Sequence, residues 1–138
     1  VDSIPAGECV FVPAALAYEC DQTIELDVIG THIGTGDYFG VGAVTVYVFE
    51  PCTTPGGGPG VRFESNVKLT IVAANGDVVN ADTNVGGCSD GVSGTEPAGS
   101  YTITGGTGRF ADASGTGTIE AVASGTSLSN EWAGTISY

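Results

Sequence analysis

Apolar and polar residues alternate along most of this chain, as they do in β-strands that bury one face. The clearest run is residues 61–73, where polar side chains alternate with Val61, Phe63, Val67, Leu69 and Ile71. Similar runs predict seven strands, at residues 23–30, 38–50, 61–73, 78–85, 99–105, 115–123 and 131–138. Asn75-Gly76 stands between two of these runs and predicts a tight hairpin. The pattern therefore predicts an all-β protein.

The directions of the seven strands call for an eighth. If consecutive strands are antiparallel, the first and the seventh run the same way and cannot pair antiparallel with each other. Residues 8–12, ECVFV, are the only candidate for a strand between them, and their insertion would close a barrel and remove both sheet edges. We predict a single closed eight-stranded antiparallel barrel at 23–138, with residues 1–22 as an N-terminal segment packed on it. A β-sandwich of the same strands is the alternative.

Composition limits the partners and the domain count. The chain has 138 residues, which suits one domain, and its 16 acidic and 3 basic residues give a formal net charge of −13. Too few cations are present to neutralise phosphates, so we expect neither nucleic acid nor an anionic membrane surface as a partner. No apolar run approaches the length that spans a bilayer.

The four cysteines predict disulfides. No pair has the C-x-x-C spacing and His32 is the only histidine, which argues against a zinc site. An even number of cysteines in a small chain that starts without Met favours a processed, secreted or extracytoplasmic protein with two disulfides. The strand directions place two of the cysteines in loops at the same end. Of three possible connectivities we therefore favour Cys9–Cys20 with Cys52–Cys88.

A glycine-rich stretch, ITGGTGRFADASGTGTI at 103–119, lies between two predicted strands. It does not fit the phosphate-binding G-x-x-x-x-G-K-[ST] pattern, and no helical pattern follows it. The interpretation that remains is a β-corner. There we expect special backbone angles at Gly105, Gly106 and Gly108, a buried Phe110, and an Arg109 that neutralises a nearby carboxylate.

The same stretch carries a family resemblance. YTITGGTGRFADASGTGTIEAV resembles the G-G-[ST]-G-x-F-x-x-A-x-G element of the allene oxide cyclase and dirigent-type barrels. GTISY, THIG and AANGD are similar to segments of uncharacterised bacterial relatives, so the resemblance covers roughly residues 23–138. It implies an eight-stranded barrel with an apolar central cavity, often in dimers or trimers. Members cyclise fatty-acid epoxides, steer the coupling of phenol radicals or catalyse cycloadditions. The shared motif is structural and implies no catalytic residue.

Other chemistry finds little support in the sequence. No G-x-S-x-G elbow accompanies His32, which is interpreted as a surface histidine. Glu25 and Asp27 alternate with apolar residues and should point outward, whereas Glu120 and Glu131 are left open. The oxygen-rich segments 80–84 and 88–96 could supply calcium ligands but do not fit the EF-hand pattern, and ordinary polar structure is the favoured interpretation. We predict no metal and no cofactor, and leave open whether the protein is an enzyme.

Aromatic residues on the predicted strands are the candidates for ligand binding. If the barrel forms, part of this set faces its interior, and the candidate ligand residues are Tyr47, Phe63, Tyr101 and Trp132. Simple core filling is the alternative. The leading hypothesis is a barrel that encloses a small apolar molecule, with a cyclase-like activity possible. The other is a structural or surface-assembly protein with a packed barrel. Strand 38–50 is apolar on both faces, so a homo-oligomer interface or the N-terminal segment should cover its second face.

Overall fold

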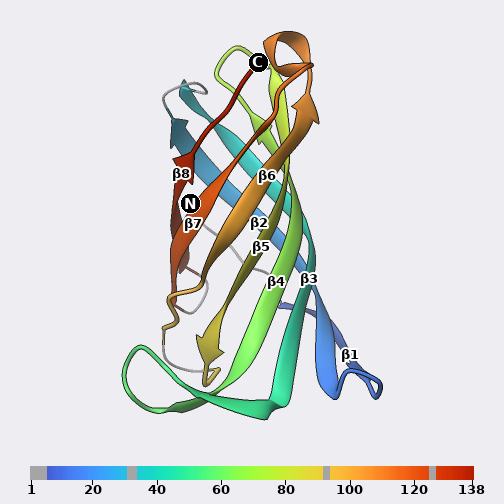
Figure 1. The fold of residues 1–138 in the computed structure, drawn as a ribbon, viewed down its shortest axis with the longest axis vertical. Coiled ribbons are helices and arrows are strands. Elements are labelled where there is room, and N and C mark those ends of the chain that lie inside the picture. Colours follow the sequence, from blue (N-terminus) through green and yellow to red (C-terminus); the bar gives the residue numbers. More distant parts are fainter. Residues whose placement is uncertain (1–5, 31–33, 92–93, 125–126) are drawn as a thin grey trace.

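A computed structural model of the chain describes residues 6–30, 34–91, 94–124 and 127–138. Its strands form one antiparallel sheet in which each strand pairs with the next along the chain (Figure 1). The strands are β1 (Ala6–Val12), β2 (Ala17–Gly30), β3 (Gly34–Thr53), β4 (Pro59–Val72), β5 (Val78–Ser89), β6 (Ala98–Gly106), β7 (Gly115–Ser124) and β8 (Ser127–Gly134). A short 3-10 turn, η1 (Gly108–Phe110), is added after β6. The predicted all-β antiparallel architecture is confirmed, as one sheet rather than a two-sheet sandwich.

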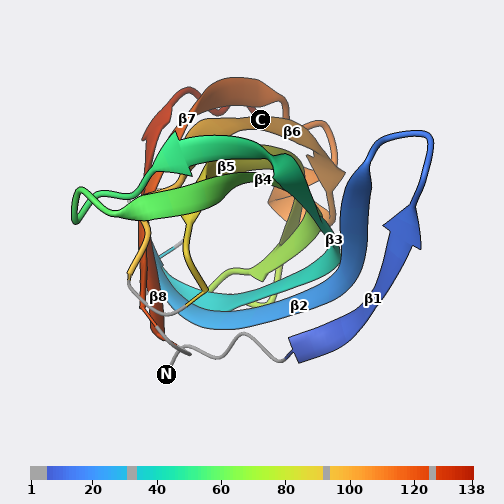
Figure 2. The same ribbon diagram turned by 90° about the horizontal axis from the view of Figure 1, so that it is seen from below.

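The sheet curls strongly around a central space, and β1 and β8 are its two edges (Figure 2). Within the described strands no ladder joins β8 to β1 or β2, so the predicted closure is not observed. β1 pairs with residues 17–22 of β2, not between β2 and β8 as predicted. The reason is that β2 starts at Ala17 and offers β1 an N-terminal extension that the sequence pattern did not indicate. The expected boundary between residues 22 and 23 therefore lies inside β2.

One end of the curled sheet is solidly packed. Along β4 the inward side chains of Val67, Leu69 and Ile71 are 2–4% exposed, as their alternation predicts. Val79 of β5 and Phe110 of η1 are fully buried beside them. Burial of these apolar side chains is the main force that holds this end together. We refer to it as the packed end.

The glycine-rich corner closes the packed end by docking on the hairpin between β4 and β5. Gly76 has a φ of +90° in this hairpin, and Ala73 N–H donates to the carbonyl of Asp77 over 2.8 Å. Asp77 in turn faces the corner, where Arg109 Nε lies 3.9 Å from its carboxylate. Gly105 and Gly108 have positive φ values of 142° and 57°.

Gly106 differs from its two neighbours, because its backbone angles are open to other residues. What requires a glycine there is close approach: a Cβ would collide with the carbonyl oxygen of Val78 and would lie 2.9 Å from Phe110. The expectation of a special backbone angle at this position is therefore replaced by a steric one.

Two disulfides, Cys9–Cys20 and Cys52–Cys88, tie the opposite end of the molecule. This is the pairing that the sequence favoured. Cys9 and Cys20 lie directly opposite each other on β1 and β2. The second bridge joins β3 to β5 across β4, and thereby fixes the glycine-rich turn at 53–59. No helix in the described residues is long and apolar enough to cross a membrane.

Candidate ligand cavity

A cavity of about 300 Å³ lies inside the curled sheet, at the end that carries Cys52–Cys88. It is lined by inward side chains of β2, β3, β4, β5, β7 and β8, together with Thr95 and Pro97 from the segment before β6. The interior is thus packed at one end and hollow at the other. Its volume is at the lower end of the range of roughly 300–1,000 Å³ that is typical of small-molecule pockets.

Most of the cavity wall is apolar. Strand alternation sends every second side chain of β3 and β4 inward, and the apolar lining on these two strands consists of Val44, Val46, Val61, Phe63 and Val67. Ile119 and Ala121 continue the wall on β7. The cavity is open space because small and β-branched side chains meet there, whereas larger rings fill the packed end.

A pair of polar side chains interrupts this wall on one side. Ser65 is 4% exposed, and its hydroxyl donates to Gln22 Oε1 over 2.6 Å. This contact occupies the amide oxygen of Gln22. For the amide nitrogen, no acceptor is found among the described residues. The Gln22 amide therefore brings N–H donors to a cavity that is otherwise mainly apolar.

A second polar group is built on β3 and β8. Trp132 Nε1 donates to Asn130 Oδ1 over 2.9 Å, and the Asn130 side chain is also hydrogen-bonded to the Tyr38 hydroxyl. Burial raises the pKa of the Tyr38 phenol well above its usual range, and the hydrogen bond from Asn130 opposes this only in part. Tyr38 is therefore a neutral hydrogen-bonding group at ordinary pH, not a base.

Trp132 holds the Asn130 side chain in place, because the amide oxygen of Asn130 accepts from the indole N–H. The Tyr38 hydroxyl beside it belongs to a side chain that lines the cavity, so Tyr38 and Asn130 together form a polar site in the cavity wall.

Three of the four predicted aromatic residues face the interior. Phe63 lines the cavity directly. Trp132 stands behind Asn130, with its indole stacked on the ring of Tyr101 at 4.7 Å between centroids and edge-on to Tyr38 at 5.9 Å. Tyr101 is 7% exposed and belongs to the core, not to the cavity lining. Trp132 and Tyr101 together form the boundary between the cavity and the packed end.

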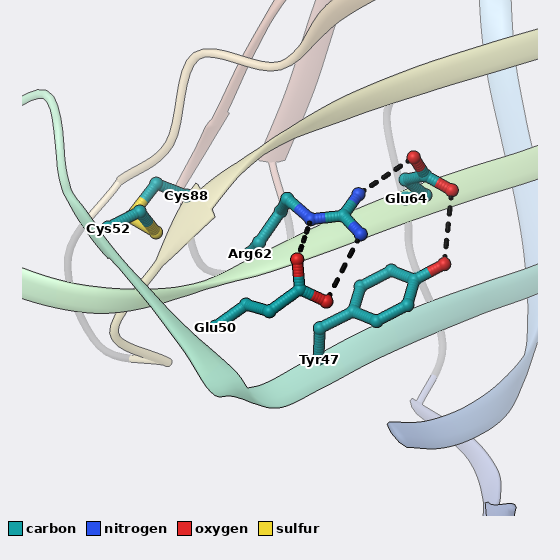
Figure 3. A network of polar contacts seen from close by, with 6 residues as sticks. All are labelled: Tyr47, Glu50, Cys52, Arg62, Glu64 and Cys88. Atoms are coloured by element: carbon teal, nitrogen blue, oxygen red, sulfur yellow. Dashed lines mark hydrogen bonds and ion pairs between the residues drawn. A yellow bond between two sulfur atoms is a disulfide. The ribbon is translucent and has the colours of Figure 1, made fainter. Parts of the chain in front are cut away.

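The fourth, Tyr47, lies on the outer face of the sheet (Figure 3). It is paired with Arg62 of β4, whose guanidinium carbon is 3.8 Å from the centre of the Tyr47 ring. The Tyr47 hydroxyl donates to Glu64 over 3.2 Å. Tyr47 therefore does not line the cavity, where the inward positions of β3 in this region are Val44 and Val46.

Arg62 is the centre of an outer-face ion network. It donates from Nε and Nη2 to Glu50, over 3.0 and 3.3 Å, and from Nη1 to Glu64 over 2.8 Å (Figure 3). A bulge in β3 makes this possible, since the register jumps between Tyr47 and Pro51 and brings Glu50 over β4. The paired acids raise the pKa of Arg62 still further above its usual range, with Glu50 the larger cause. The network thus links β3 to β4 on the outer side of the cavity wall.

Gln22, Tyr38 and Asn130 are three polar cavity residues that the sequence analysis did not single out. A signal for two of them exists in the pattern. Gln22 stands two residues before buried Ile24, and Asn130 two residues before Trp132, so both are polar residues at inward positions. A polar residue on a buried strand face requires a partner and so points to a special role.

The remaining candidates are not brought together into a site. His32 lies outside the described residues. Glu25 and Asp27 are exposed, and Glu120 and Glu131 are exposed cross-strand neighbours on β7 and β8. Within the part of the chain that the structure describes, no cluster of three or more acidic, histidine or cysteine side chains could hold a metal ion.

Comparison of the chain with protein families, with curated proteins and with solved structures finds no match. The geometry of the cavity is therefore the basis for the function proposed below.

Proposed function

We propose that this protein binds a small apolar molecule in its interior cavity. The observation that carries the proposal is a hollow of about 300 Å³ with a largely apolar wall and a few convergent polar groups. Folding normally fills an interior, because each void forfeits packing contacts. A hollow beside a well-packed core is therefore best explained by an occupant.

The proposal extends to the fold family and the chemistry. A sequential eight-stranded meander, the GGTGRF corner at one end and an interior cavity all suit a closed barrel of the allene oxide cyclase and dirigent type. The described wall offers shape and neutral hydrogen bonds, with no charged side chain. The reaction that such a wall would suit is a cyclisation without cofactor, in which the cavity imposes the fold of a reactive substrate.

We also propose that the protein acts outside the cytoplasm. Its two disulfides are consistent with an extracellular protein, because such bonds persist in oxidising compartments. A net charge of −13 adds colloidal solubility there.

Binding of an apolar fluorescent dye tests the proposal. Ala123 lines the cavity, whereas its neighbour Val122 on β7 is 55% exposed on the other face. Ala123→Phe should fill the cavity and abolish saturable dye binding, and Val122→Phe is the matched control that should leave it intact. Native mass spectrometry of the purified protein would identify a ligand that co-purifies. The proposal is abandoned if a chemically varied set of apolar dyes does not bind, or if both variants bind alike.

A structural role in surface assembly is the second candidate. It is favoured by exposed apolar side chains on the outer face of β3, where Phe39, Val41 and Phe49 are 40%, 66% and 68% exposed. These could pair copies of the chain, as proposed from the two apolar faces of this strand. Light scattering would show a homo-oligomer that Val41→Lys reduces to monomers. A monomeric parent protein would contradict this candidate.

A further inference from the structure

Charge is distributed very unevenly between the cavity and the outer surface. None of the described side chains that line the cavity carries a charge. The three Lys and Arg side chains lie outside it and are engaged by acids: Arg62 with Glu50 and Glu64, Lys68 with Asp82, and Arg109 with Asp77. A bound carboxylate would therefore find no counter-charge in the described lining, and burying an unpaired charge is strongly unfavourable.

Acidic side chains beside the cavity strengthen this discrimination. Glu96, Glu120 and Glu131 surround a groove that shares Pro97 and Asn130 with the cavity lining. Their negative field repels an anion that approaches this wall, in a protein whose net charge is already −13. An uncharged molecule is not affected by this repulsion.

Two side chains that line the cavity can donate hydrogen bonds to a ligand. Oε1 of Gln22 is occupied by Ser65, so its amide nitrogen has donors to offer. The Tyr38 hydroxyl lies beside the Asn130 side chain, which Trp132 holds in place, and is a second group that can donate to a ligand. Both side chains line the cavity. A ligand that accepts hydrogen bonds would satisfy these groups, whereas a pure hydrocarbon would leave them unpaired.

We propose that the cavity selects an uncharged apolar ligand with a hydrogen-bond acceptor, such as a ketone, an ester or an epoxide, and excludes carboxylates. The acceptor oxygen is held by the Tyr38 hydroxyl or by the amide of Gln22. This inference rests on the proposed binding function and specifies its ligand class. The cavity has the volume of about ten water molecules, so the ligand has on the order of ten non-hydrogen atoms.

Three probes with the same ring system test the ligand class: naphthalene, 2-acetylnaphthalene and 2-naphthoate, of which the last two are equal in size. Their affinities are measured by fluorescence titration of the intact protein at about pH 7. We expect 2-acetylnaphthalene to bind about fivefold or more tightly than naphthalene, because one hydrogen bond is gained. We expect 2-naphthoate to bind at least about a hundredfold more weakly than the ketone, because its charge is unpaired.

The pH dependence separates the charge of the probe from its shape. Binding of 2-naphthoate should strengthen as the pH falls toward about 4, where a carboxylic acid becomes protonated and neutral. The ketone, measured at the same pH, reports whether the cavity itself is still intact. Tyr38 is the only titratable side chain in the described lining, and it stays protonated throughout this range.

Variants locate the donor. Tyr38→Phe keeps the ring but removes the hydroxyl, and Gln22→Leu removes the amide. At least one of them should weaken ketone binding about five- to tenfold and leave naphthalene binding unchanged. Tyr101→Phe is the matched control, because it removes a phenol hydroxyl that bonds the carbonyl of Thr135 and does not line the cavity.

The outcomes distinguish this inference from the function on which it rests. If naphthalene and the ketone bind equally, or if 2-naphthoate binds as well as the ketone at about pH 7, the ligand class is wrong while the binding function stands. The donor assignment fails if neither variant changes ketone affinity. If none of the three probes binds, both the inference and the binding function are overturned.

Discussion

The indole of Trp132 stacks on the phenol ring of Tyr101, with centroids 4.7 Å apart and planes inclined by 23°. The pair connects β8 to β6, although these two strands are not neighbours in the sheet. Glycines make room for it: a Cβ at Gly117 or Gly134 would lie 2.7 Å from the Tyr101 hydroxyl oxygen. This pair lies between the cavity and the packed core. Its loss should therefore affect both ligand binding and the stability of the fold.

Truncation of Trp132 should destabilise the fold. Trp132→Ala removes the stack on Tyr101 and the edge contact to Tyr38, and should cost about 3 kcal/mol of unfolding free energy. Trp132→Phe keeps a ring and should cost less. Urea titrations followed by circular dichroism give both values, since the chain has no other tryptophan to report by fluorescence. A loss below about 1 kcal/mol for Trp132→Ala would show that the stack is not part of the stabilising core.

Two aromatic residues on neighbouring strands should behave oppositely in ligand binding. Phe63 lines the cavity, and Phe63→Ala should weaken binding of an apolar dye about tenfold through loss of aromatic contact. Tyr47→Ala should leave the affinity unchanged, because Tyr47 packs under Arg62 on the outer face. Dye titration of the two variants checks this. Equal losses in both would mean that the faces of β3 and β4 are assigned wrongly.

The strands were predictable because alternation is a local signal. In β4 the buried residues Val67, Leu69 and Ile71 alternate with exposed ones, and the pattern alone assigns the face. In β3 both faces are apolar, so the sequence could not decide between Val46 and Tyr47 as the inward residue. The length of β2 was underestimated for a similar reason. Its first residues, AYECDQ, mix polar and apolar side chains without clear alternation, so the pattern did not indicate a strand there.

The cavity was less predictable than the strands, because it depends on how side-chain volumes add up across six strands. Gln22 and Asn130 are far apart in the sequence, and only the curl of the sheet brings β2 and β8 to the same hollow. Nothing local distinguishes them from surface residues except their position on an inward face. The disulfide pairing was easier, since strand directions alone put Cys52 and Cys88 at the same end.

Oxidation of all four cysteines is expected in the native protein. Its intact mass should lie about 4 Da below that of the reduced chain, and peptide mapping should give Cys9–Cys20 and Cys52–Cys88. The bridges close segments with sequence separations of 11 and 36 residues. Chain entropy alone therefore gives about 3 kcal/mol for the first and about 4 for the second. Free thiols in the folded protein would contradict the proposal of an extracellular protein, and a Cys20–Cys88 peptide would contradict only the pairing.

Tyr38 should make the fold sensitive to alkaline pH. An unfolded phenol ionises near about pH 10, whereas burial raises the pKa of Tyr38 in the folded protein. The unfolded state therefore loses this proton first, and stability should fall as the pH rises beyond about 10. In Tyr38→Phe this loss should be smaller between about pH 8 and pH 11, as measured by denaturant midpoints. An identical loss in parent and variant would mean that Tyr38 ionises as freely as an exposed tyrosine.

The glycine corner should tolerate valine at neither of its two tight positions. Gly106→Val would drive a side chain into the carbonyl of Val78 and against Phe110, the fully buried ring of the packed end. Gly108→Val would hold a β-branched residue at a φ of +57°. Each should cost more than about 1 kcal/mol of unfolding free energy, measured by thermal or urea denaturation.

The neighbours of these glycines provide the controls. Arg109→Ala should cost less, because its ion pair with Asp77 spans 3.9 Å and both partners are partly solvated. Gly56→Val should be nearly neutral, since the nearest atom to its Cβ would be 4.0 Å away in an exposed turn. The corner lies at the opposite end from the cavity, so folded Gly106→Val protein should still bind the dye with parental affinity. If both valine variants have the melting temperature of the parent protein, the corner is not a packing constraint and Phe110 is held in place by other contacts.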